Sequence, residues 1–194
     1  MNKRKPNRLK GHDYSTPGAY FITVCAHDQF ENRNIFGTIH DGKMIKNRYA
    51  DLITSSWYDL PNHYHHIALD EFVVMPDHFH SIVWINKTVG NGLEPFQKHG
   101  LPEIIRGFKT FSARHINEIN HDDKFQWQKS YYDHVIRSEK SLLMIREYIR
   151  NNPEKWELDH DQSEGNDISQ MLINGGVRNG LKPFPTKNIR ITGH

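Results

Sequence analysis

The chain has 194 residues, of which 36% are hydrophobic and 11% aromatic, so we expect one domain with one sizeable core and an appended tail. The formal net charge of +2 is too small to indicate a polyanionic partner by itself. The single cysteine, Cys25, excludes an intramolecular disulfide framework and a cysteine-rich zinc site, and its apolar neighbours predict a core position. No apolar run approaches the roughly 18 to 20 residues of a bilayer-spanning helix, and no signal-peptide pattern follows the basic start. We therefore expect a cytoplasmic protein without a membrane partner.

The predicted elements alternate between strands and helices along the chain. Residues 1–17 are polar and basic, and form either an arm that contacts nucleic acid or a solvated terminus. The elements that follow are a strand over 19–26, a hairpin over 35–45 with an Asp-Gly turn, a helix over 47–60, two strands within 71–85, a helix over 102–119, a strand over 125–137 and a helix over 138–152. Residues 86–100, rich in Gly and Asn, predict a mobile loop, and residues 159–194 predict a linker and tail. This order is typical of the α+β class, with one ferredoxin-like antiparallel sheet and helices packed on a face of it.

Two histidines stand between the two strands predicted within residues 71–85. His78 and His80 are separated by one residue, and alternate side chains of a strand share a face, so both rings are expected to point the same way. Two imidazoles in this arrangement can hold one divalent metal ion. The spacing alone is weak evidence, because 14 histidines in 194 residues give about one His-x-His by chance, and residues 63–65 form a second copy. The apolar strands on either side favour the 78/80 pair, since they would hold the rings on a rigid element.

The last predicted helix carries a second pair of polar residues. Tyr148 and Asn152 are four residues apart, at the edge of an apolar stripe over 142–149. A phenol has a free pKa of about 10, so it could act as a nucleophile there only with help from a metal or a base. Asn152 could then supply an oxygen ligand to a metal held by His78 and His80. In the alternative, Tyr148 is a packing residue with a solvent-exposed hydroxyl, and Asn152 is a helix-end residue before a proline.

Five blocks of sequence are spread over the length of the chain. They are Gly18-Ala-Tyr-Phe-Ile-Thr-Val24, Phe72-Val-Val-Met-Pro-Asp-His-Phe-His80, Phe108-Lys109, Tyr132-Asp-His-Val-Ile-Arg137 and Glu147-Tyr-Ile-Arg-Asn-Asn-Pro153. With these blocks in this order, residues 13–158 resemble the single-tyrosine HUH transposases, and most closely the REP-associated tyrosine transposases. That group usually has Asn before the first histidine, where this chain has Asp77. The change adds a carboxylate beside the site and is expected to matter little to metal binding.

The resemblance implies an HUH endonuclease fold over 18–158, in which His78, His80 and Asn152 bind Mg²⁺ or Mn²⁺. It further implies that Tyr148 attacks a DNA phosphate, leaving a 5′-phosphotyrosine link and a free 3′-OH. The implied substrate is single-stranded DNA folded into hairpins, the repetitive extragenic palindromes (REP), read partly through a short guide sequence. The implied enzyme is nucleoid-associated and works as a monomer or a homodimer. Basic residues expected to hold phosphates are Lys3, Arg4, Lys5, Arg106 and Lys109.

Other histidines offer competing sites. His134, beside Asp133, could be a base oriented by a carboxylate, although a position on the strand surface is the more common outcome. His63, His65 and His66 could bind zinc, but no further ligand cluster with suitable spacing follows them, which favours a solvated turn. We therefore leave these residues outside the predicted site.

Two other functions compete with the transposase interpretation. A histidine-triad nucleotide hydrolase also has alternating histidines on a strand, but it needs a third at position 82, which is Ile82 here. The serious alternative is a non-catalytic DNA-hairpin-binding protein that keeps the fold without the chemistry. The presence of His78, His80, Tyr148 and Asn152 together favours the enzyme.

Overall fold

The computed structural model describes residues 9, 11–30, 34–87, 99–120 and 124–161. Its centre is a four-stranded antiparallel sheet in the order β4-β5-β1-β6, and β2 and β3 form a separate hairpin. The strands are β1 (Gly18–Cys25), β2 (Gly37–His40), β3 (Lys43–Lys46), β4 (Ile67–Val74), β5 (His78–Ile85) and β6 (Tyr132–Ile136). The helices are α1 (Arg48–Tyr58), α2 (Leu60–His63), α3 (Leu101–Ile119), α4 (Glu139–Arg150) and α5 (Asn152–Asp161), with a 3-10 turn over Asp28–Phe30. This strand order confirms the ferredoxin-like α+β prediction.

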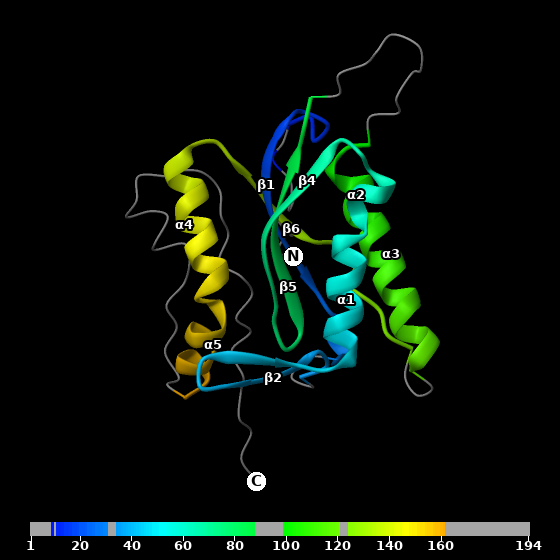
Figure 1. Ribbon diagram of the computed structural model, residues 1–194, viewed down its shortest axis with the longest axis vertical. Helices are drawn as coiled ribbons and strands as arrows, with labels where there is room; N and C mark the ends of the chain where they lie inside the picture. The colour runs from blue at the N-terminus through cyan, green and yellow to red at the C-terminus, as the bar shows by residue number, and fades with distance from the viewer. Residues whose placement is uncertain (1–8, 10, 31–33, 88–98, 121–123, 162–194) are drawn as a thin grey trace, which may run out of the picture.

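Helices cover both faces of the sheet, where the sequence predicted one (Figure 1). α1 and α3 pack on one face, over a large core in which Trp57, Phe79 and Phe108 are fully buried. Their ring centroids lie 5.0 to 5.3 Å apart. α4 packs on the other face, over a smaller cluster formed by Ala19, Phe21, Ile82, Leu142, Ile145 and Ile149. The second face is covered because the apolar stripe of α4 packs against alternate residues of β1 and β5.

The register between β1 and β5 places the two histidines. These strands pair over eight residues each, with Thr23 opposite His80 and Cys25 opposite His78. Because successive side chains of a strand point to opposite faces, Phe79 enters the larger core while both histidines face α4. The structure therefore shows the shared face that the sequence predicted. Cys25 is only half-buried, not a core residue as predicted, because it is the last residue of β1.

The hairpin of β2 and β3 turns at Asp41-Gly42, as predicted from that residue pair. Both residues have a positive φ, 51° at Asp41 and 68° at Gly42, which a type I′ turn requires. The Gly42 N–H donates to the Glu157 carboxylate of α5 over 2.5 Å. A side chain at Gly42 would meet Glu154 Cβ at 3.4 Å, so the turn lies close against the helix. The hairpin therefore extends from the α1 side of the sheet to α5, and its turn contacts that helix (Figure 1).

The last predicted helix is two helices in the structure. Ser138 caps α4 by accepting a backbone N–H of its first turn, as predicted. α4 ends at Arg150, and α5 begins at Asn152, directly before Pro153. A proline is tolerated in the first turn of a helix because an N–H there has no intrahelical acceptor. Pro153 therefore starts a helix that the sequence analysis missed, and the tail predicted from residue 159 begins inside α5, which runs to Asp161.

The strand predicted over 125–137 is a strand only in its last part, which is β6. Residues 124–131, which we call the strap, cross the end of β1 and are joined to it by an isolated bridge between Ala26 and Trp127. Phe125 is 1% exposed and Trp127 6% exposed, both within the core that α3 covers. The aromatic residues that suggested a strand are therefore core residues of an irregular segment.

Side chains of α3 hold the strap in place. The Asn117 amide exchanges two hydrogen bonds with the backbone of Phe125, at 2.7 and 3.0 Å. The Lys109 ammonium donates to the carbonyl oxygens of Gln128 at 2.5 Å and Lys129 at 3.1 Å. These contacts fix the strap against the end of β1, which pairs with the start of β5, where the two histidines lie.

The helices predicted over 47–60 and 102–119 are α1 and α3, with Asn47 as the N-cap of α1. No helix among the described residues is long and apolar enough to cross a membrane. Parts of three predicted segments fall outside the described residues: most of the basic arm, the centre of the loop over 86–100, and the tail from 162 onward.

Replacing Asn117 with alanine is expected to lower the free energy of unfolding by about 1 to 3 kcal/mol, because the N–H and C=O of Phe125 lose their partners in a part-buried position. Urea denaturation followed by circular dichroism measures the change. The exposed neighbour Glu118 is the matched control, and Glu118→Ala should change stability by less than about 0.5 kcal/mol. Equal effects of the two substitutions would contradict the anchoring of the strap by Asn117.

Candidate active site

Each histidine of the pair is oriented by a contact at its Nδ1 atom. His80 Nδ1 lies 2.8 Å from the Thr23 hydroxyl, which is its neighbour across β1 and β5. His78 Nδ1 lies 2.6 Å from a carboxylate oxygen of Asp77. An ionised carboxylate only accepts, so His78 carries a proton on Nδ1 and donates it to Asp77. Both Nε2 atoms are left for a shared ligand, which is the usual arrangement of metal-binding histidines.

The two Nε2 atoms lie 3.0 Å apart. Two nitrogen lone pairs repel at this distance, so the approach requires a proton or a cation between them. His78 and His80 would hold a small divalent cation through these two nitrogen atoms. Burial first, and repulsion from His78 second, lower the pKa of His80 well below its ordinary value. His80 is therefore neutral at pH 7, the form that binds metals, and the pair fits a small divalent cation.

Tyr148 lies over His80 from α4. Its hydroxyl is 3.5 Å from His80 Nε2, at the outer limit of a hydrogen bond. The Tyr148 ring packs edge-on to Phe21 at a centroid distance of 6.0 Å, and Phe21 stacks on His80 at 5.6 Å. The Nζ atom of Lys155 lies 5.8 Å from the centroid of the Tyr148 ring. That positive charge favours any negative charge that develops on the phenol oxygen.

Asn152 is buried at the first position of α5, with 7% of its surface exposed. One helical turn later, Trp156 packs on His78 at a ring-centroid distance of 5.3 Å. Residues four apart share a helix face, so the face that carries Asn152 is turned toward the start of β5. No cluster of three or more His, Cys, Asp or Glu side chains suited to a metal occurs in the part of the chain that the structure describes. The amide oxygen of Asn152 remains the predicted third protein ligand of a metal on His78 and His80.

Residues 26–152 match the family model described as "Transposase IS200 like", a match that spans both histidines and Tyr148 and ends at Asn152. The chain belongs to the IS200-like transposase family. A Haemophilus influenzae protein, described as uncharacterized, is 37% identical over 175 residues, which cover 82% of this chain and 93% of that protein.

This IS200-like transposase is also similar to two solved structures. One is a REP-associated tyrosine transposase bound to a REP hairpin; it is 19% identical, with a TM-score of 0.44, over 80% of this chain and 74% of that one. The other is a Deinococcus radiodurans protein assigned as a transposase; it is 21% identical, with a TM-score of 0.43, over 74% of this chain and 97% of that one.

The five basic residues predicted to bind DNA lie in different settings. Lys3, Arg4 and Lys5 lie outside the described residues. Arg106 is exposed on α3. Lys109 is half-buried, and its ammonium makes the two carbonyl contacts to the strap. Burial lowers the pKa of Lys109, while Cys25 opposes that change. Lys109 therefore has a structural contact, and its contact with DNA stays a prediction.

The other histidines noted in the sequence do not converge in the described structure. Their contacts are His63 with the Asp59 carboxylate at 2.9 Å, His65 with the Pro61 carbonyl at 3.1 Å and His66 with the His99 carbonyl at 2.8 Å. The alternative in which Asp133 orients His134 as a base, which the sequence already disfavoured, is not formed, since the two side chains point to opposite faces. Asp133 accepts a hydrogen bond from Tyr14 on the core face, while His134 is paired with Phe21 on the α4 face.

Two consecutive acidic residues of β4 hold α4 in place. The pairing of β4 with β5 shifts register at this point, and the bulge presents both Asp70 and Glu71 to α4. Arg146 donates to both carboxylate oxygens of Asp70, at 2.9 and 2.7 Å. Arg150 donates twice to one oxygen of Glu71, at 2.9 and 2.7 Å. These four residues, which we call the arginine clamp, flank Tyr148 because the two arginines lie two residues on either side of it.

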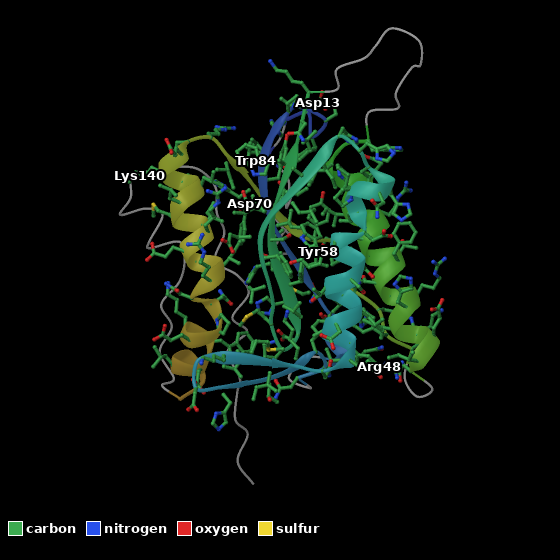
Figure 2. All side chains as sticks on the ribbon, viewed as in Figure 1. Asp13, Arg48, Tyr58, Asp70, Trp84 and Lys140 are labelled. Carbon is green, nitrogen blue, oxygen red and sulfur yellow. The ribbon has the colours of Figure 1, made fainter. Side chains whose placement is uncertain are left out.

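Asp70 is the more deeply placed carboxylate of the clamp, with 11% of its side chain exposed. It also accepts the indole N–H of Trp84 at 2.8 Å and the backbone N–H of Glu71 at 2.7 Å. Figure 2 shows Asp70 and Trp84 on the side of the sheet that faces α4. Burial raises the pKa of Asp70, but the hydrogen bonds from Arg146, Trp84 and Glu71 outweigh it and lower the pKa to about 2.

Sequence reasoning missed several residues that shape the site. An acidic pair inside an apolar strand, and two arginines that flank Tyr148 at a spacing of four, were available signals for the clamp. Trp156 follows Asn152 by one helical turn, a spacing that is informative only if residues 152–161 are recognised as a helix. Thr23 carries no signal of its own, since its contact with His80 depends on the strand register.

The protonation of Asp70 is expected to destabilise the fold between about pH 4 and about pH 2. Its pKa is lowered from the ordinary 3.8 to about 2 in the folded state, so its contribution is complete above pH 4 and is lost as the pH falls toward 2. At about 1.4 kcal/mol per pH unit, that contribution is about 2 kcal/mol. Asp70→Asn should therefore lower the free energy of unfolding by about 2 kcal/mol at pH 7 and have little effect at pH 2. Urea denaturation across this range measures it, with Glu118→Gln as the control; a deficit that stays constant down to pH 2 would contradict the assignment.

Proposed function

We propose that this transposase nicks and rejoins single-stranded DNA at or near hairpins, with Tyr148 as the nucleophile. The observation that carries the proposal is the 3.5 Å contact between the Tyr148 hydroxyl and His80 Nε2, beside the 3.0 Å approach of the two histidine Nε2 atoms. A nucleophile and a metal must reach the same phosphate, so their side chains have to meet at one point. His78, His80 and Asn152 would hold Mg²⁺ or Mn²⁺, which polarises the scissile phosphate when bound.

In the cleavage step the Tyr148 oxygen forms a bond to the phosphorus, and the bond from phosphorus to the 3′ oxygen breaks. The fragment on the 3′ side of the break keeps the phosphate on its 5′ oxygen and stays on the enzyme as a 5′-phosphotyrosine. The phenol proton passes to water, and the departing 3′ oxygen takes up a proton to become a free 3′-OH. In the joining step a 3′-OH attacks the phosphotyrosine and Tyr148 leaves, so the strands are rejoined without ATP because the phosphodiester energy is kept in the link. The positive charge of Lys155 near the Tyr148 ring supports both steps.

The proposed substrate is a REP-like DNA hairpin, with single-stranded DNA beside it. Support comes from the five sequence blocks shared with the REP-associated tyrosine transposases. Arg106, Lys109 and the basic residues Lys3, Arg4 and Lys5 are the proposed phosphate contacts, through charge neutralisation that weakens with salt. We further propose that the protein acts at the nucleoid in the cytoplasm, as a monomer or a homodimer.

A covalent adduct is the expected product when the protein is incubated with 5′- and 3′-labelled hairpin DNA and Mn²⁺. The 3′ label should stay with the protein in denaturing gels while the 5′-labelled fragment is released, and peptide mass spectrometry should place the link on Tyr148. Tyr148→Phe should form no adduct and bind the hairpin within about threefold of wild type, because only one hydroxyl is lost. Tyr132→Phe is the matched control and should react normally. An adduct with Tyr148→Phe would overturn the nucleophile; hairpin binding without adduct in wild type would favour the non-catalytic DNA-binding alternative.

Removing a metal ligand is expected to affect DNA cleavage much more than hairpin binding. His80→Ala should abolish cleavage while leaving hairpin binding largely intact, because DNA affinity comes mainly from basic residues elsewhere. Thr23→Val removes only the partner of His80 Nδ1 and should weaken Mn²⁺ binding by about tenfold or more, as measured by electron paramagnetic resonance. Ser81→Ala, at the neighbouring buried position on the other face, is the control. An equal loss of hairpin binding in His80→Ala would point to a structural role for the pair.

A further inference from the structure

We propose that the arginine clamp positions Tyr148, and that its four residues act on the rate of DNA cleavage through the placement of α4. This inference rests on the proposed function, since it concerns the same tyrosine. Asp70 and Glu71 are in β4, and Arg146 and Arg150 are in α4, so both pairs tie the helix that carries the nucleophile to the sheet that carries the histidines.

Apolar packing alone leaves the position of Tyr148 along the helix axis poorly determined. The stripe of α4 that meets the sheet is aliphatic, with Ile145 1% exposed and Ile149 fully buried. Each such side chain stabilises the docked helix by about 1.5 to 3 kcal/mol on full burial, but dispersion and hydrophobic contacts have little directional preference. Aliphatic contacts of this kind do not select one orientation of the helix as hydrogen bonds do. A group with directional contacts is therefore needed to set the tyrosine to within a fraction of an ångström.

The clamp supplies that direction from both sides of the tyrosine. A guanidinium is planar and donates along fixed directions, so the bidentate pair of Arg146 with Asp70 restricts both rotation and sliding of the helix. The pair of Arg150 with Glu71 lies one turn further along the same helix face. With one fixed point before Tyr148 and one after it, the hydroxyl is held at 3.5 Å from His80 Nε2.

The bulge in β4 makes the double attachment possible. In a regular strand Asp70 and Glu71 would point to opposite faces, and only one of them could reach α4. The register shift between Leu69 and Phe72 turns both toward the helix. A misplacement of about 1 Å costs roughly a hundredfold in rate when groups must meet in a reacting geometry. The bulge therefore acts on catalysis at a distance from the reacting atoms.

Charge exchange at the outer pair tests this role. Arg150 is 58% exposed and Glu71 33% exposed, so both positions can accept the opposite charge without burying it. Arg150→Glu and Glu71→Arg are each expected to lower the single-turnover rate of adduct formation at saturating Mn²⁺ and hairpin by at least tenfold. The double variant, which restores an ion pair with the charges exchanged, should recover to within about threefold of wild type, since a positioning pair depends on attraction rather than on which partner is positive. The exposed pair of Arg114 with Glu118 on α3 is the matched control, and its exchange should leave the rate unchanged.

The outcomes separate the possible roles of Arg150. If Arg150 acted by touching a DNA phosphate, the double variant would stay as slow as Arg150→Glu and would lose hairpin affinity, which overturns the proposal. Single variants that keep the wild-type rate would overturn it as well. A readout without DNA comes from protein labelled with 3-fluorotyrosine, in which the ¹⁹F signal of Tyr148 is assigned from Tyr148→Phe. That signal should shift in the single variants and return in the double one. If the signal follows this pattern but wild type forms no adduct, the proposed chemistry fails while the positioning of Tyr148 stands.

Discussion

The docking of α4 on the sheet is the interaction on which the proposed site depends. His78 and His80 belong to a central strand, whereas Tyr148 belongs to a helix that follows much later in the chain, and only the packed interface brings them within reach. Most of the docking free energy comes from buried aliphatic side chains, at about 1.5 to 3 kcal/mol each on full burial. An exposed ion pair such as that of Arg150 with Glu71 contributes about 0.2 to 1 kcal/mol. The two kinds of contact therefore have separate roles at this interface. Apolar contacts supply most of the free energy that docks α4 on the sheet, and the arginine clamp fixes the position of the helix.

The histidine end of the sheet is rigid for a different reason. It is enclosed by segments outside the central sheet: the strap over 124–131 is anchored to α3, and the hairpin of β2 and β3 reaches α5. Thr23 and Asp77 hold the two rings at Nδ1, so both Nε2 atoms are aimed at one point. Rings that are oriented in advance lower the cost of binding a cation there. A metal is thus expected to find its two histidine ligands already placed, while the proposed nucleophile, Tyr148, is positioned by α4.

Much of this arrangement follows from local sequence, and the remainder depends on tertiary contacts. The shared face of the two histidines comes from the two-residue period of a strand, and the Asp41-Gly42 turn comes from the need for positive φ. Pro153 misled the prediction because the same residue can follow a helix or begin one. The strap was mistaken for a strand because its aromatic residues are buried against a helix instead of within a sheet. The contacts of Thr23 and Asp70 require the strand register and a bulge, which no local pattern specifies.

The central claim is that one divalent ion and Tyr148 meet at the same DNA phosphate. It is tested most directly by a crystal structure of Tyr148→Phe with hairpin DNA and Mn²⁺, with data collected for anomalous scattering. The account predicts one anomalous peak between the Nε2 atoms of His78 and His80, with a phosphate oxygen on the ion and the phosphorus facing the ring of residue 148. A Mn²⁺ ion held away from this pair, or a scissile phosphate on the far side of the sheet from α4, would contradict it.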